Sequence, residues 1–157
     1  MASIKIATLN CRGLMSPAKR RRLNLYVKQH RVDILSLQET HVADNSLMTE
    51  IANEWGMRGY WSLGSYQSKG VAILFKLSLN VTHNCHFRDS DGRLVVVNMK
   101  MGDENFRLIN IYAPNKARER YNFFKAVEDR LHAPGIRVLV AGDFNCVEDA
   151  SLDRVTT

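Results

Sequence analysis

Short runs that are apolar on both faces of an extended backbone constrain the fold of this chain most strongly. Residues 4–9 form the first such run, and residues 32–37 and 136–141 are also rich in aliphatic side chains. Strands of this composition are stable where both faces of their sheet are covered. The chain must therefore form layers, with sheets covered by helices or by each other.

Three helices are predicted between these runs. The first begins after Ser16, which can act as the N-cap, with Pro17 at the first helical position. A second helix begins at Asn45 or Ser46, and a third covers residues 116–132. Apolar residues recur along each of them at helical spacing, so each helix can place one apolar side on a sheet.

The middle of the chain changes to strands and turns. The predicted strands are residues 70–75, 80–87, 94–101 and 106–112, and turns rich in Gly, Asp and Asn separate the last three. The order is therefore strand, helix, strand, helix, several antiparallel strands, then helix and strand. This order predicts an α/β (α+β) sandwich, in which two packed β-sheets are flanked by helices.

Length and composition indicate one ordinary globular domain. A chain of 157 residues corresponds to a single domain, and 45% hydrophobic with 24% charged residues excludes a disordered or collagen-like chain. No apolar stretch approaches the roughly 18 residues of a membrane helix. The N-terminus also lacks the apolar core of a secretory signal. We therefore expect no membrane partner.

Charge and cysteine content point to an intracellular protein. The net charge of +6 permits a polyanionic partner. The basic run at residues 19–22 is expected to lie largely on the outer face of the first helix. There it is more often a solvated face than a nuclear-import or phosphate-contact patch. Cys11, Cys85 and Cys146 cannot all pair and have no metal-ligand spacing, so we expect reduced thiols and an intracellular, nuclear location.

Polar residues gather where the predicted strands stop. Asn10 ends the first strand, Glu39 follows the second, and the last strand is followed by Asp143 and Asn145. Another strand ends at the segment 112–115, which contains Tyr112 and Asn115. Ligands bind beyond the carboxyl ends of strands in sheets of this kind. If these four strands run the same way, their polar ends converge on one site.

The residue types at these strand ends suit a hard divalent cation and a phosphate. Glu39 and Asp143 supply carboxylate oxygens, and Asn10 or Asn145 supplies a neutral amide oxygen. This ligand mixture favours Mg²⁺ or Mn²⁺ over zinc. Taken singly, each Asn is more simply explained as a turn residue. The coincidence of four polar strand ends favours the functional interpretation.

Four motifs occur in one order: Leu-Asn at 9–10, Leu-Gln-Glu-Thr-His at 37–41, Ile-Tyr-Ala-Pro-Asn at 111–115 and Gly-Asp-Phe-Asn at 142–145. Together they resemble the endonuclease/exonuclease/phosphatase superfamily, and in particular the apurinic-type endonuclease domain of non-LTR (LINE-type) retrotransposons. The segment 146–154 strengthens the narrower resemblance. The resemblance implies a DNase I-like fold and hydrolysis of a DNA phosphodiester to a 3′-hydroxyl and a 5′-phosphate.

The resemblance also implies a role for each matched residue at the reacting centre. Glu39 matches the principal Mg²⁺ ligand and Asn10 its neighbour beside the metal. Asp143, which is also expected near the metal, matches the carboxylate that positions or deprotonates the attacking water. His41 belongs to the same motif as Glu39, and we expect a structural role for it.

A second group of residues is expected to contact the substrate. Tyr112 and Asn115 match residues that contact or orient the scissile phosphate, and Asn145 matches the amide that stabilises the phosphoryl oxygens. Arg118 and Arg120 follow Asn115 at the start of a helix. They are therefore well placed to contact the DNA backbone.

One motif of the family is absent from these 157 residues. The family carries a later Ser-Asp-His segment whose His contacts the phosphate, and no Ser-Asp-His occurs here. We therefore expect residues 1–157 to be the N-terminal portion of a single domain. Part of the second sheet is then missing and the activity impaired. The chain is expected to be a monomer, or a dimer through an exposed sheet edge.

Two other functions compete with the nuclease hypothesis. The chain is alternatively a catalytically inactive nucleic-acid-binding fragment. A phosphatase acting on phosphoinositides is less favoured, because of the basic charge balance and the retrotransposon-like segments.

Overall fold

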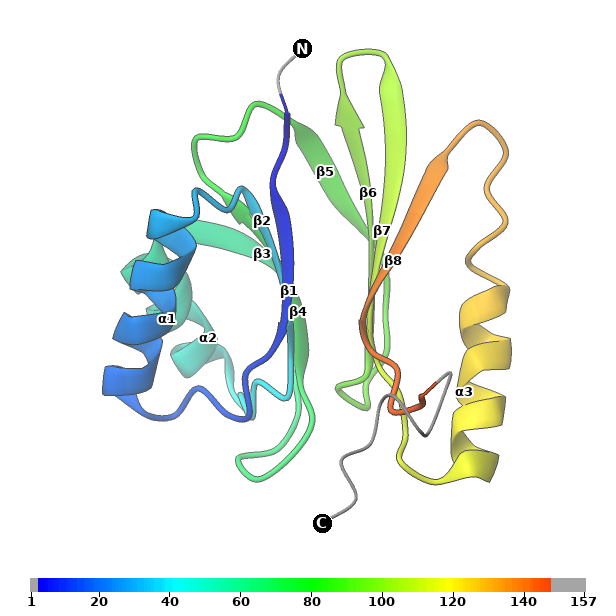
Figure 1. Ribbon diagram of the computed structural model, residues 1–157, viewed down its shortest axis with the longest axis horizontal. Helices are drawn as coiled ribbons and strands as arrows, with labels where there is room; N and C mark the ends of the chain where they lie inside the picture. The colour runs from blue at the N-terminus through cyan, green and yellow to red at the C-terminus, as the bar shows by residue number, and fades with distance from the viewer. Residues whose placement is uncertain (1–2, 148–157) are drawn as a thin grey trace.

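Within residues 3–147, which the computed structural model describes, eight strands form two four-stranded sheets. The strand order in the first sheet is β1 (Ile6–Asn10), β2 (Ile34–Gln38), β4 (Val71–Lys76) and β3 (Met57–Ser62). The order in the second is β5 (Thr82–Arg88), β6 (Leu94–Met101), β7 (Glu104–Tyr112) and β8 (Arg137–Asp143). The two sheets face each other (Figure 1). The predicted sandwich is therefore confirmed.

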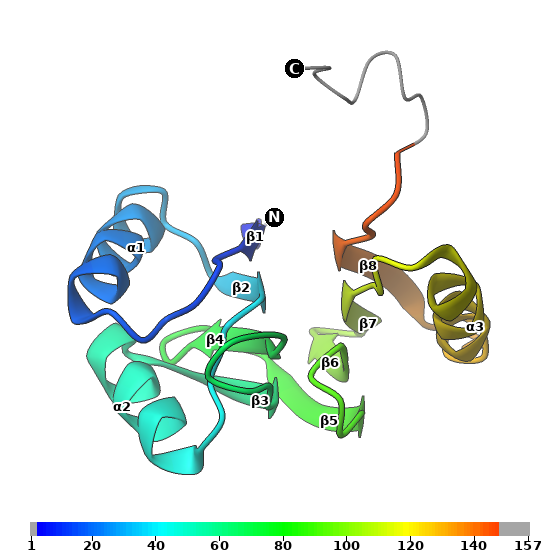
Figure 2. The same ribbon diagram turned by 90° about the horizontal axis from the view of Figure 1, so that it is seen from below.

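Three helices cover the outer faces of this sandwich in the described part of the chain. Figure 2 shows α1 (Pro17–Gln29) and α2 (Asn45–Trp55) against the first sheet, and α3 (Ala117–Glu128) against the second. The resulting layers are helices, sheet, sheet and helix. This arrangement gives every central strand two covered faces, as their composition requires.

The core has three layers, and β6 shows why. The valines of this strand alternate between two apolar clusters. Val95 and Val97 pack between the sheets, and Val96 packs under α3 together with Ile109. A third cluster lies between the first sheet and its helices and includes Trp55. A strand that faces two cores reads as a continuous apolar run, which explains the pattern of residues 94–97.

Two parallel strand pairs set the position of the functional residues. β1 runs parallel to β2, with Asn10 opposite Gln38. β7 runs parallel to β8, with Tyr112 opposite Asp143, and the remaining strand pairs are antiparallel. The carboxyl ends of β1 and β8 lie at the same end of the molecule, at the bottom of Figure 1. The predicted convergence of strand ends therefore occurs.

Helix capping agrees with the sequence for α1 and differs by one residue for α2. Ser16 caps α1 by accepting a hydrogen bond from the backbone of Lys19, and Pro17 is the first helical residue. Asp44, not Asn45 or Ser46, caps α2, because its Oδ1 accepts from the Leu47 amide at 2.8 Å. The third helix ends at Glu128, four residues earlier than predicted.

The prediction that residues 19–22 lie largely on the outer face of α1 is wrong for Arg20. This side chain is only 2% exposed and bonds to Glu50 at 2.6 Å and to Glu54 at 2.9 Å. It also donates to the carbonyl of Leu14. Arg20 therefore joins α1 to α2 and has no free charge to offer a partner.

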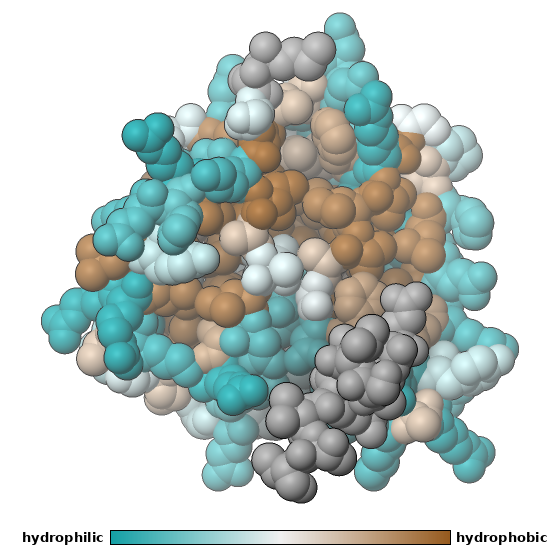
Figure 3. All heavy atoms as spheres, in the orientation of Figure 1, coloured by the Kyte–Doolittle hydropathy of each residue, from teal (hydrophilic) through white to brown (hydrophobic). Residues whose placement is uncertain are grey.

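The two lateral sides of the sandwich differ in how their edge strands are protected. The β5 edge is polar and has a bulge between Cys85 and Phe87, which are features that discourage pairing with another chain. On the opposite side the edge strands are β1 and β8. Within the described residues, β1 pairs only with β2, and β8 only with β7. Figure 3 shows apolar surface across this side, which carries β1 and β8 and faces the viewer. Exposed apolar side chains there include Leu9, Leu139 and Phe144.

In residues 3–147, no helix has the length and apolar character required to cross a membrane.

Candidate functional site

One amide joins the two carboxylates that the strand-end pattern singles out. The Asn10 Nδ2 donates to Glu39 Oε1 at 2.8 Å and to Asp143 Oδ2 at 2.8 Å. Asn10 ends β1, Glu39 follows β2, and Asp143 ends β8, so the site spans both sheets. The structure therefore brings together the three residues proposed as metal-proximal.

The backbone fixes the orientation of the Asn10 amide. The backbone N–H of Arg12 donates to Asn10 Oδ1 at 3.2 Å, so the NH₂ group faces the carboxylates. Arg12 has a φ of 46° and Glu39 a φ of 51°, both in the left-handed region that non-glycine residues adopt at an energetic cost. Strained residues are common at functional sites, and here two of them flank the shared amide.

The remaining oxygens of the two carboxylates have few partners. Asp143 Oδ1 accepts from the Asn145 backbone N–H at 3.0 Å. Glu39 Oε2 lies 3.6 Å from the Nε2 of His41, which is longer than a hydrogen bond. Two carboxylates therefore meet at the single Asn10 amide. A cation would relieve this repulsion.

The donor set fits Mg²⁺ or Mn²⁺. In the described part of the chain, no three side chains of His, Cys, Asp or Glu form a metal-binding group. The carboxylates of Glu39 and Asp143 would therefore be completed mainly by water. The Asn10 oxygen could join them only if its amide turned away from the Arg12 N–H. Mg²⁺ is usually bound in this way, through one or two carboxylates and several waters. Zinc sites are built mainly from several thiolate and imidazole ligands. Cys11 is a poor thiolate because burial raises its pKa to about 12, and His41 is then a single imidazole beside Glu39.

Tyr112 stands beside this pair as a protonated phenol. Burial raises the pKa of its hydroxyl, and the charge of Glu39 raises it further. Arg93 opposes this shift: its guanidinium lies 5.1 Å from the centre of the Tyr112 ring. The Arg93 Nη1 also donates to the Tyr112 carbonyl at 3.0 Å. The phenol is therefore a hydrogen-bond donor in the neutral pH range.

Of the predicted substrate-binding residues, some are held by hydrogen bonds to the backbone and others are exposed. The Asn145 Nδ2 donates to the Ala113 carbonyl at 2.6 Å, which leaves one N–H of that amide for another partner. The Arg120 Nη1 donates to the carbonyl of Asn115 at 2.7 Å and thereby holds the loop before α3. Asn115 and Arg118 are exposed. Their predicted roles in DNA contact stay predictions.

Two residues that shape the site carry no recognisable signal in the sequence. Arg93 directly follows a predicted turn, and nothing in the sequence distinguishes it from a solvated arginine. Asn110 lies inside the apolar run 108–111 and is fully buried. Its Oδ1 accepts from Gln38 Nε2 at 2.7 Å, and its Nδ2 donates to the carbonyls of Leu37 and Ala72. These contacts link the two sheets directly behind Glu39.

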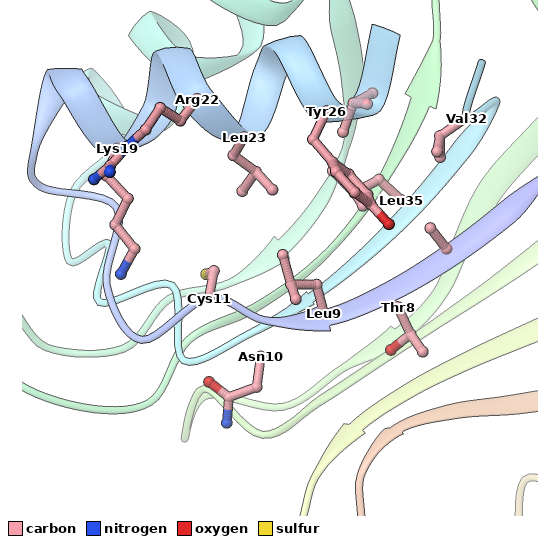
Figure 4. A pocket seen from close by; sticks show the side chains of 12 residues that line it. Thr8, Leu9, Asn10, Cys11, Lys19, Arg22, Leu23, Tyr26, Val32 and Leu35 are labelled. Carbon is pink, nitrogen blue, oxygen red and sulfur yellow. The ribbon is translucent and has the colours of Figure 1, made fainter. Parts of the chain in front are cut away.

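Two hollows meet at Asn10. A polar cavity of about 580 Å³ is lined by Asn10, Gln38, Asp143 and Asn145 among others. A more apolar groove of about 610 Å³ runs between α1 and β1. Figure 4 shows Lys19, Leu23 and Tyr26 along this groove. No carboxylate lines the groove, so the chemistry of the site belongs to the polar cavity.

Sequence comparison relates the chain to proteins of DNA metabolism and to a transposon. It is 34% identical over 125 residues to the DNA repair nuclease APEX1 of Danio rerio, covering 74% of this chain and 38% of that protein. It is 27% identical over 150 residues to the Transposon TX1 uncharacterized 149 kDa protein of Xenopus laevis, covering 94% of this chain and 11% of that protein. The chain therefore spans well under half the length of these relatives.

Solved structures share the fold. The endonuclease domain of TRAS1, a telomere-specific non-LTR retrotransposon, has a TM-score of 0.66 at 17% identity. The match covers 93% of this chain and 61% of that structure. An AP endonuclease from Archaeoglobus fulgidus has a TM-score of 0.62 at 24% identity, covering 91% of this chain and 58% of that one. These likenesses confirm the DNase I-like sandwich.

The family model described as Endonuclease/Exonuclease/phosphatase family matches residues 7–156, which is nearly the whole chain. This match confirms the resemblance that the four strand-end motifs carry. The chain belongs to the Endonuclease/Exonuclease/phosphatase family.

Proposed function

We propose that this chain is a Mg²⁺-dependent DNA endonuclease domain of retrotransposon type, which nicks DNA to a 3′-hydroxyl and a 5′-phosphate. The observation that carries the proposal is the Asn10 amide held between Glu39 and Asp143 at the meeting point of both sheets. The names of the APEX1 and transposon relatives favour a DNA substrate over a phosphoinositide.

Each side chain of the site has a chemical task in this reaction. Glu39 would hold the metal, and Asn10 would join it once its amide turns its oxygen from the Arg12 N–H toward the carboxylates. The metal would supply Lewis-acid stabilisation to the phosphoryl and leaving oxygens. Asp143 orients a water and accepts its proton as the water attacks phosphorus. Tyr112 and Asn145 donate hydrogen bonds to the negative charge that grows on the phosphoryl oxygens.

Cationic side chains on separate elements flank the site and suit a polyanionic substrate. Lys19 is held beside it, because its Nζ donates to the Arg12 carbonyl at 2.8 Å. Arg93 lies on the Tyr112 side, and Arg118 is exposed at the start of α3. A duplex lying across the strand ends would meet these charges through its backbone phosphates.

The decisive experiment is nicking of supercoiled plasmid with Mg²⁺, by the wild-type chain and by Glu39→Gln. We expect wild-type nicking that EDTA abolishes and that Glu39→Gln lowers at least about 10²–10³-fold, because charge stabilisation at phosphorus is lost. Glu128→Gln, an exposed carboxylate on α3, is the matched control and should nick normally. Nicks should be sealed by DNA ligase, which requires a 3′-hydroxyl and a 5′-phosphate.

A second candidate function is nucleic-acid binding without hydrolysis, which needs only the cationic side chains that flank the site, namely Lys19, Arg93 and Arg118. Nicking that persists in EDTA or in Glu39→Gln contradicts the proposed mechanism. Folded protein that binds DNA and never nicks it establishes the second function instead.

A further inference from the structure

Three charged side chains form a bridge on the rim of the site. The Asp91 carboxylate lies between Lys69 and Arg93, with one oxygen on each cation. Lys69 Nζ pairs with Asp91 Oδ1, and Arg93 Nε lies 3.3 Å from Asp91 Oδ2. Asp91 itself is 60% exposed. The two cations are therefore spaced to hold two oxygens of a single anionic group.

The loops that carry this bridge are held against the catalytic segment by backbone hydrogen bonds. His41 and Thr40 donate to the carbonyls of Lys69 and Gly70 at 2.9 and 3.0 Å, and Gly70 donates to the Gly92 carbonyl at 2.9 Å. A side chain at Gly70 would approach the Thr40 hydroxyl to 2.2 Å. The loop with Lys69 and the turn with Asp91 thus occupy fixed positions beside Glu39.

The turn does not depend on Asp91 for its shape. Asp89 holds it, because Asp89 Oδ1 accepts from the Ser62 hydroxyl at 2.6 Å and from the backbone N–H of Arg93 and Leu94. Within this turn, Asp91 accepts no such hydrogen bond from a backbone N–H. Its interactions are with the two cations.

The bridge also reaches the reacting centre. Arg93 contacts both the ring and the backbone carbonyl of Tyr112. The charge of Glu39 in turn raises the pKa of the Tyr112 hydroxyl. The bridge is more open to solvent than the Arg20 cluster, since Asp91 is 60% exposed and Arg93 16%, against 2% for Arg20. A solvent-exposed ion pair contributes little to stability.

We propose that Lys69 and Arg93 form a binding site for a backbone phosphate flanking the scissile one, and that Asp91 occupies this site in the free protein. This inference rests on the proposed DNA substrate. A phosphodiester presents two non-bridging oxygens with negative charge, as the Asp91 carboxylate does, and both Lys and Arg bind phosphate well. DNA displaces Asp91 by a side-chain rotation. The internal carboxylate therefore weakens DNA binding and limits the counterion release that accompanies it.

The test is equilibrium binding of a labelled duplex in EDTA, where no hydrolysis occurs, across a range of salt concentrations. We expect Asp91→Asn to bind DNA about 3–10-fold more tightly at low salt, with a salt dependence steeper by about one charge. Lys69→Met should weaken binding, and Lys69→Met combined with Asp91→Asn should lose most of the gain. Asp103→Asn removes an exposed carboxylate from a turn at the far end of β6 and β7, and should change little.

Binding by Asp91→Asn that equals or falls below wild type, with its melting temperature retained, overturns this inference. Asp91→Ser gives the same test if the amide perturbs the turn. If the wild-type protein nicks plasmid but Asp91→Asn binds DNA with unchanged affinity, the phosphate site is rejected and the proposed function is not. Wild-type protein that neither binds nor nicks DNA rejects the proposed function, and the phosphate site with it.

Discussion

Two asparagines bridge strands in this molecule, and they serve opposite purposes. Asn110 is fully buried, and its amide contacts only neutral partners: Gln38 and the carbonyls of Leu37 and Ala72. Asn10 makes a bridge of the same kind at the strand ends, but both acceptors of its NH₂ are carboxylates. The difference lies in the charge of the partners.

A neutral amide whose partners are all satisfied stabilises the fold, because no polar group is left buried and unpaired. A neutral amide between two anions leaves their repulsion in place, and the fold gains little from holding them together. Polar groups that a protein keeps in an unfavourable arrangement are candidates for function. The buried bridge thus contributes to stability, whereas the strand-end bridge is where the proposed reaction would take place.

The largest effect that would test this division is the loss of Asp143. Asp143→Asn should lower the plasmid-nicking rate about 10²–10⁴-fold, because the proton acceptor for the attacking water is lost. Its melting temperature in EDTA should equal or exceed that of wild type, since one of two like charges is removed. A variant that nicks normally, or that unfolds at much lower temperature, would contradict the separate roles assigned to the two asparagine bridges.

The next effect concerns the buried bridge and should fall on stability. Asn110→Ala should lower the free energy of unfolding by about 3 kcal/mol, because it removes three hydrogen bonds made by a fully buried amide. Urea unfolding measures this loss, and exposed Asn105→Ala is the control. The folded fraction of Asn110→Ala should still be stabilised by Mg²⁺. A small stability change would show that the bridge is dispensable.

The smallest effect concerns a third polar cluster, the Arg20 contact between α1 and α2. The hydrogen bond from Arg20 holds the pKa of Glu54 below its ordinary value of 4.5. The ionised carboxylate therefore stabilises the fold above pH 4.5, and this contribution is lost as the pH falls through the folded-state pKa.

Glu54→Gln should accordingly show a smaller loss of stability between neutral and acidic pH than wild type. Because Glu54 is about one-third exposed, we expect a difference of less than about 1 kcal/mol. Urea midpoints measured across this pH range detect it, with Glu128→Gln as the control. Identical pH profiles for wild type and Glu54→Gln would show that the contact carries no electrostatic stabilisation.

Much of the fold was readable from local patterns, and the failures have specific causes. Residues 94–101 were predicted as a strand and form β6 with the same ends. The charge of Arg20 predicts an exposed side chain, but its spacing of three and seven residues from Leu23 and Val27 puts it on their face of the helix. Asn110 had no local signal, because its partners come from two other strands.

The sequence alone predicts that polar residues stand close to the ends of four strands, and what chemistry those residues offer. Strand composition, turn residues and the order of carboxylates and amides are local properties, and they identified Asn10, Glu39 and Asp143 as one group. Only the tertiary structure decided that Asn10 and Asp143, which are 133 positions apart, share a hydrogen bond. It also decided that Asp91 lies between two cations from different loops. Such contacts depend on how the two sheets and their loops pack, and no local periodicity encodes that packing.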